Sequence, residues 1–130
     1  MSTRLYEHPI FLEHVTPSGH PERSDRIRAL NVALEHPNFE RLDRKQAPQA
    51  SEDAVLLAHP EEHLLAVMRQ IPEEEDKINQ LEADTYASQK SLQAALTGIG
   101  GAMAPWMTCS GARRIMSSSR RARRVTMPRR

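Results

Sequence analysis

Histidines are the residues of this sequence whose chemistry is most adaptable, because imidazole both binds metals and transfers protons near neutral pH. The first three of the six recur every six residues, which suits neither one helix face nor a short zinc knuckle. His59 and His63 are four residues apart, but Pro60 between them predicts that they stand where a helix begins. No Cys or carboxylate stands at ligand spacing to complete a site. The residues alone therefore predict ordinary loop histidines. The sequence also contains neither a phosphate-binding glycine loop nor a Ser-His-Asp arrangement.

The elements around the first histidines form a strand, an exposed loop and a helix. Residues 4–12 predict a first strand, in which Pro9 indicates an irregularity or an edge position. A turn rich in Thr, Pro, Ser and Gly follows, and His20-Pro21-Glu22-Arg23 then opens a helix, where proline fits the first turn. Ile27, Leu30 and Leu34 recur at helical spacing and give this helix one apolar face. Such a loop between two regular elements is a common place for functional residues.

The rest of the chain alternates in the same way. The first helix should end near residue 36, since a residue before proline avoids the helical region, and residues 42–47 predict a short second strand. Ser51 is a plausible N-cap for a helical run up to Ala58, and a second amphipathic helix follows Pro60. After an acidic connector at 72–76, Ser88 or Ser91 caps a last helix that ends at Met103. This alternation predicts an α/β fold.

One loop carries a resemblance to a known family. The run His14-Val-Thr-Pro-Ser-Gly-His20-Pro21-Glu22-Arg23, continued by Arg26 and Leu30, resembles the opening loop of the histone deacetylase and acetylpolyamine amidohydrolase superfamily. The stretch Ala83-Asp84-Thr85-Tyr86-Ala87-Ser88 looks like the second rim loop of its deacetylase-like members. The resemblance extends to about Met103. It implies that residues 1–104 are the N-terminal portion of an arginase–deacetylase-like open parallel sheet flanked by helices, and that this sheet is incomplete.

The resemblance also implies a chemistry. In the family, a zinc ion held by two Asp and one His activates water against an acetyl-lysine or acetylpolyamine-type substrate, a His pair moves protons and a Tyr helps to hold the oxyanion. Those zinc-binding and general-base motifs lie downstream of the matching loops, and none can be read here. We therefore expect no catalytic residue and no bound zinc in this chain, which should be an inactive, truncated homologue of a zinc-dependent amide hydrolase.

Four residues correspond to the mouth of the family's substrate channel: His20, Glu22, Asp84 and Tyr86. The resemblance implies that they bind substrate, because an acidic side chain there can accept a substrate hydrogen bond or attract an amine. A purely structural interpretation stays open for each loop. His20-Pro21-Glu22 would then be a helix cap, and Asp84 would belong to an Asx-type turn.

The charge of the chain divides sharply near Pro105. All 17 acidic residues lie in residues 1–104, with 10 of the 18 Lys and Arg, whereas residues 105–130 hold the other 8, all arginine. We interpret residues 105–130 as a basic, disordered tail translated in a shifted reading frame. Permitted codons for Trp106–Cys109, regrouped by one base, encode an apolar residue, two Asp and another apolar residue. Those for residues 121–129 can encode Arg-Pro-Pro-Gly-His-His-Ala-Glu, which contains the family's His pair.

A different class of function stays open for the same tail. A small helical adaptor with a basic nucleic-acid-binding arm would also have this charge distribution, although the tail lacks aromatic residues interleaved for base stacking. No apolar run approaches the roughly 20 residues of a membrane helix, which predicts no membrane partner. The N-terminus lacks a secretory signal, so the expected location is the cytoplasm. Cys109 is the single cysteine, which excludes an internal disulfide.

Overall fold

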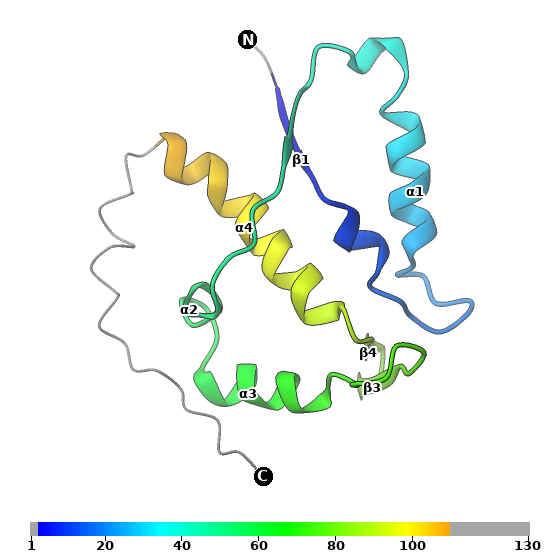
Figure 1. The fold of residues 1–130 in the computed structure, drawn as a ribbon, viewed down its shortest axis with the longest axis vertical. Coiled ribbons are helices and arrows are strands. Elements are labelled where there is room, and N and C mark those ends of the chain that lie inside the picture. Colours follow the sequence, from blue (N-terminus) through cyan, green and yellow to red (C-terminus); the bar gives the residue numbers. More distant parts are fainter. Residues whose placement is uncertain (1–2, 110–130) are drawn as a thin grey trace.

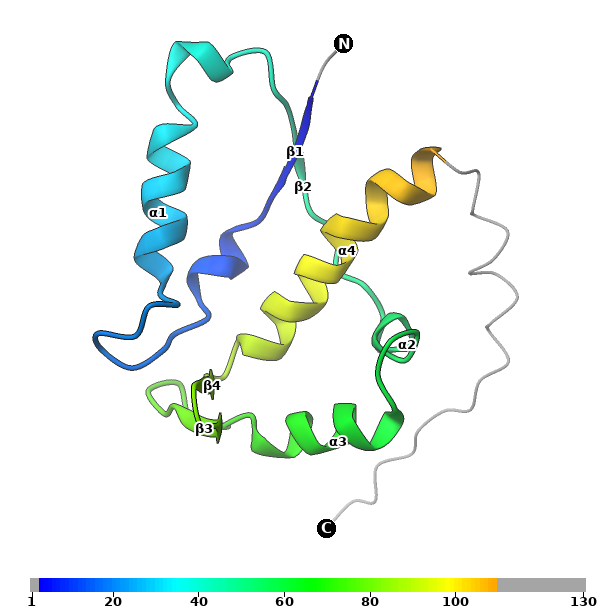
Figure 2. The ribbon, with the colours of Figure 1, turned by 180° about the vertical axis from the view of Figure 1, so that it is seen from behind.

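A long helix organises the computed structural model, which describes residues 3–109 of the 130 (Figure 1). Helix α4 (Ser91–Cys109) crosses the centre, a small parallel sheet lies beside it, and the remaining helices are spread around it. The view from behind shows the same arrangement, with the short helix η1 (Pro9–Leu12) between α1 (Ser24–Ala33) and α4 (Figure 2). No helix of the described part is both long and apolar enough to cross a membrane.

The parallel sheet consists of β1 (Arg4–Glu7) and β2 (Asp43–Gln46), with Arg4 opposite Asp43 and Glu7 opposite Gln46. Arg4 Nε lies 2.9 Å from Asp43 Oδ2 across the sheet. Hydrogen bonds from Lys45 and Arg4 lower the pKa of the Asp43 carboxyl. The predicted α/β class is therefore confirmed: two strands separated by a helix pair in parallel.

The predicted first strand is too long. Its second half forms the 3-10 helix η1 (Pro9–Leu12), because His8 Nδ1 accepts a hydrogen bond from the Ile10 N–H at 3.0 Å and turns the chain at Pro9. The side chain of Ile10 is buried as a result. The irregularity expected at Pro9 is thus a change of element.

Helix α1 (Ser24–Ala33) begins later than the sequence predicts and is followed by the short 3-10 helix η2 (Pro37–Phe39). Its expected apolar face is only partly covered. Ile27 and Leu34 are half-buried, whereas Leu30 is 52% exposed. Helix α1 packs mainly on η1, and Arg44 of β2 donates a hydrogen bond to the backbone oxygen of Leu34 at its C-terminal end.

The connection from β2 to α3 passes tightly over α4. It includes α2 (Glu52–Val55), which follows Ser51 as expected, and leads to α3 (Glu61–Gln70), where Leu64 is buried. The Ala50 N–H donates to Leu96 O at 3.0 Å. A Cβ built on Gly100 would lie 1.9 Å from Pro48 O, so this approach requires a residue without a side chain.

Helix α4 is longer than expected. It continues to Cys109 with Pro105 inside it, whereas the sequence predicts an end at Met103 and a break at the proline. Proline forfeits one backbone hydrogen bond, but packing of the preceding turns, where Ala94, Leu96 and Thr97 are buried, holds the helix axis. The predicted disorder of the tail is wrong for residues 105–109, and residues 110–130 lie outside the described part.

A β-hairpin that the sequence does not predict precedes α4. Strands β3 (Asn79–Glu82) and β4 (Thr85–Ala87) pair in antiparallel fashion, with an irregularity between Gln80 and Glu82. The turn of this hairpin carries Asp84. The second rim loop is therefore the tip of a hairpin.

Candidate functional site

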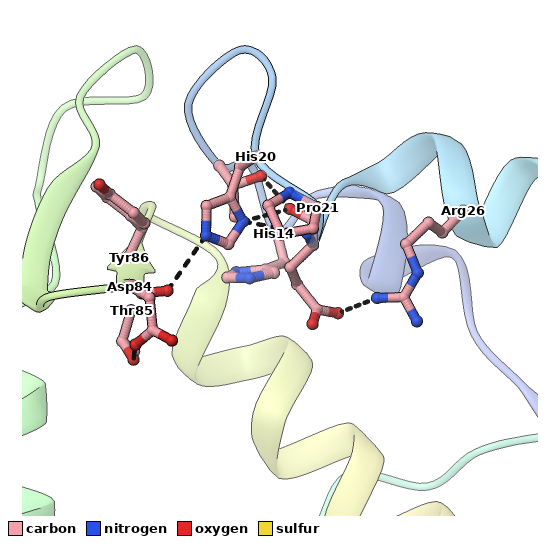
Figure 3. Close-up of a pocket in the computed structure, with 9 residues that line it drawn as sticks. His14, His20, Pro21, Arg26, Asp84, Thr85 and Tyr86 are labelled. Atoms are coloured by element: carbon pink, nitrogen blue, oxygen red, sulfur yellow. Dashed lines mark hydrogen bonds and ion pairs between the residues drawn. The ribbon is translucent and has the colours of Figure 1, made fainter.

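The loop before α1 and the β3–β4 hairpin meet around one open cavity of about 550 Å³. All four residues that the sequence analysis assigns to substrate binding line it, although the two pairs are separated by more than 60 positions in the chain (Figure 3). The complete lining is His14, Thr16, His20, Pro21, Glu22, Arg26, Asp84, Thr85 and Tyr86.

His20 lies between the two sides of the cavity. Its Nδ1 lies 3.1 Å from Glu22 N and 3.0 Å from Glu22 O; when Nδ1 accepts the Glu22 N–H, the neutral ring carries its proton on Nε2. That atom lies 3.2 Å from Asp84 O and donates to it. The His20 ring also meets the Tyr86 ring edge-on, with centroids 5.2 Å apart. The helix-cap interpretation of His20 is wrong, because α1 begins at Ser24 and Arg23 is its N-cap; the His20 ring instead bonds the turn at Glu22 and makes a second contact with Asp84 O.

The two carboxylates of the cavity differ in their electrostatic surroundings. Glu22 Oε1 forms an ion pair with Arg26 Nη1 at 3.0 Å, one helical turn on, and the Glu22 backbone oxygen accepts from the Thr16 hydroxyl. The exposed Asp84 has only Thr85 Oγ1 near its carboxylate, at 3.5 Å, and no cation pairs with it within residues 3–109. Asp84 is therefore the uncompensated negative charge at this cavity.

A part-buried network of small polar groups, which the sequence analysis did not identify, lies beside the cavity and includes His14 of its lining. Ser88 Oγ accepts the Val15 N–H at 3.0 Å and donates to Glu13 O at 3.3 Å. Ser91 Oγ accepts the Ser88 N–H at 2.8 Å and lies 2.7 Å from His14 Nδ1. These bonds attach the first loop to the start of α4, across more than 70 residues of sequence. Their only sequence signal was the pair of serines, which we expected merely to cap α4.

His14 is the ionisable member of this network. Burial lowers its pKa; the Glu22 carboxylate opposes this effect, and a protonated His20 would add to it. The neutral ring matches the geometry, since the Ser91 hydroxyl can then donate to Nδ1. We infer that His14 is neutral when the loop is attached to α4.

This assignment predicts a pH dependence of stability. Because the folded-state pKa of His14 is below its ordinary value of 6.5, the unfolded chain binds the proton more readily. The contribution of His14 is fully present above pH 6.5 and is lost as the pH falls from there through the lowered value. Between pH 7.5 and 5.5, the free energy of unfolding measured with urea should therefore fall more for the wild-type chain than for His14→Gln. His36→Gln, at an exposed histidine away from the cavity, serves as the control, and equal losses in wild type and His14→Gln would contradict the assignment.

The described side chains do not form a zinc site. Within residues 3–109, no three His, Cys, Asp or Glu side chains come together as a group that could hold a metal. The His59 and His63 rings do stack, 4.9 Å apart, but no third donor joins them in this region. The described residues do not fit the zinc site that the resemblance implies for the family, and no catalytic step can be assigned to them.

Comparisons with known proteins agree with the fold and the loops. The family model of the histone deacetylase domain matches residues 20–128, a range that runs past the boundary we predict at Pro105. The crystal structure of the HDA15 HD domain is similar, with a TM-score of 0.66 and 26% identity, over 77% of this chain. This chain spans 29% of the length of that one. No curated protein matches. The match over most of the chain shows that this protein belongs to the histone deacetylase domain family.

Proposed function

We propose that this chain forms part of the substrate mouth of a zinc-dependent deacetylase that acts on acetyl-lysine or acetylpolyamine-type substrates. The observation that carries the proposal is the cavity between the two loops, where the Asp84 carboxylate has no cationic partner among the described residues. The family acts on acetylated substrates, and both loops lie in or beside the matched range. The 29% coverage of the similar deacetylase domain supports the idea that this chain corresponds to a portion of such a domain.

Asp84 is the residue that we assign to ligand binding. A carboxylate accepts charge-assisted hydrogen bonds from a substrate N–H or from a protonated amine, and such bonds are about twice as strong as neutral ones. The half-buried Tyr86 ring on the same hairpin offers a surface for the methylene chain of the substrate. Glu22 contributes less to this binding, because Arg26 already neutralises it.

We further propose that residues 1–130 are truncated and catalytically inactive on their own. The family's two Asp, one His and His pair cannot be read in this sequence, and isolated histidines do not replace such a ligand set. The chemistry would then require residues that this reading frame does not encode. The change of charge at Pro105 and the regrouped codons support a shifted frame as the cause.

The binding role can be tested with an acetylated diamine as the probe, observed by NMR titration of the full chain. Asp84→Asn should weaken binding about fivefold or more, because it removes a charge-assisted contact worth about 1–3 kcal/mol. Asp76→Asn is the matched control, since Asp76 is an exposed aspartate that does not line the cavity. The proposal fails if the probe does not bind, or if the two variants bind it equally well.

A further inference from the structure

A repeated local device singles out His20. Three His-Pro dipeptides of this chain, at His8, His20 and His36, make the same local hydrogen bond, in which Nδ1 of the histidine accepts the backbone N–H two residues on. At His8 and His36 this bond caps a 3-10 helix, whereas at His20 it closes a turn before α1. The N···N distances are 3.0, 3.1 and 3.3 Å, respectively. In each neutral ring the proton is therefore on Nε2, which points away from this local bond and is available as a donor.

Among these three histidines, only His20 directs its Nε2 at a distant segment within residues 3–109. Its Nε2 lies 3.2 Å from the backbone oxygen of Asp84, 64 residues away in the sequence. Figure 3 shows the ring between the first loop and the hairpin tip, with this bond directed at the Asp84 backbone. His20 is thus hydrogen-bonded to the backbone of Asp84, the residue whose carboxylate has no cationic partner within residues 3–109.

The hairpin tip has little else to hold it. The other side-chain hydrogen bonds to its turn, within the described residues, come from the hairpin itself: Gln80 Nε2 donates to Ala83 O at 3.1 Å, and Thr85 lies near Asp84. An isolated two-stranded hairpin is only marginally stable in water, and this one has an irregular register. A bond from outside the hairpin therefore has a large influence on the direction of the Asp84 side chain.

We propose that His20 is a positioning residue, which orients the Asp84 carboxylate through the Nε2–H···O=C bond and does not itself contact the ligand. For the role of Asp84 this rests on the proposed function. The proposal also gives two of the rim residues different roles: Asp84 contacts the substrate, and His20 acts on the substrate only through Asp84.

Three substitutions separate the two bonds of His20. Asn in place of His20 keeps an acceptor near the position of Nδ1, as in an Asx turn, but is too short to reach Asp84 O. Gln in place of His20 loses that acceptor but places an amide N–H near the position of Nε2. His36→Asn is the matched control, because it makes the same change at a His-Pro cap that lacks a bond to the hairpin.

The first measurement is amide hydrogen exchange at Thr85 and Tyr86 by NMR in the full chain without ligand. We expect His20→Asn to speed this exchange about fivefold, the effect of losing one hydrogen bond of about 1 kcal/mol. His20→Gln should stay within about twofold of wild type, and His36→Asn should have no effect. Unchanged exchange in His20→Asn, or equal acceleration in His36→Asn, would overturn the proposal.

The second measurement is affinity for the acetylated diamine, in the wild-type background and in Asp84→Asn. His20→Asn should weaken binding about fivefold in the first background and leave it unchanged in the second, because its effect passes through Asp84. Equal weakening in both backgrounds would mean that His20 touches the ligand and would overturn the positioning role. If the wild-type chain does not bind the probe, the proposed function fails, while the exchange measurement still decides whether His20 holds the hairpin.

Discussion

Replacing Gly100 by alanine is expected to destabilise the protein by about 3 kcal/mol or more, enough to unfold a marginally stable chain. The new Cβ would lie 1.9 Å from Pro48 O and 2.8 Å from Ala50 N, and both of these are backbone atoms that cannot rotate away. Relief would require the segment to leave α4, with loss of the bond from Ala50 N–H to Leu96 O. Thermal and urea unfolding of the purified variant measure the effect.

Gly98→Ala provides the control in the same helix. A Cβ there has only Phe11 Cε1 nearby, at 4.0 Å, so alanine fits and should stabilise the helix by about 0.5–1 kcal/mol. The two substitutions make the same chemical change two residues apart and should have opposite signs. Equal melting temperatures for both variants would show that the β2–α2 segment does not pass close to Gly100.

Insertion of one nucleotide at the Ala104–Pro105 codons should produce a longer protein that binds zinc and releases acetate from an acetylated amine. With permitted codons, the restored frame follows Ala104 with Ala, Val and Asp, so that α4 regains the N–H donor that Pro105 lacks. Downstream, the arginine-rich segment is replaced by the regrouped motif with the His pair. The expected change runs from no measurable activity to chelator-sensitive turnover, which an acetate-release assay with metal analysis detects.

A three-nucleotide insertion at the same site is the control, because it lengthens the chain without changing the frame. It should yield neither zinc binding nor turnover. The idea of a shifted frame is rejected if a stop codon follows soon after the regrouped His-His, or if the extended product binds no zinc. The one-residue insertion also reports whether the body tolerates a change at the end of α4.

The parts of the fold that the sequence predicted are those with strong local signals. Breakers at Pro37 and Pro60 separate the helices, and the short segment around β2 lies between them. The prediction that Asp84 and Tyr86 belong to the same site as His20 came from the resemblance to a family, because residues 64 positions apart show no local sign of contact in the sequence. The resemblance therefore predicts both rim loops as parts of one site, whereas local sequence patterns do not.

The parts that failed depend on tertiary contacts. The β3–β4 hairpin was missed because Asn79, Glu82 and Asp84 disfavour strands and the alternation is too short to be distinctive. Pro105 looked like the end of a helix, yet α4 continues past it. The His14–Ser91 contact joins residues 77 positions apart, and nothing in either segment indicates its partner. Local preference set the elements, and packing set their limits and their partners.

The two-stranded sheet has a consequence for handling the protein. In residues 3–109, β1 and β2 pair only with each other, so each leaves one side of its backbone without a strand neighbour. Unpaired strand edges can pair with strands from other molecules, and the exposed Leu30 and Val32 of α1 add apolar surface that favours association. Ion pairs across the sheet, such as Arg4–Asp43, place charges on these edges and oppose such growth. The free edges of β1 and β2 are therefore where we expect association with other molecules to begin as the protein is concentrated.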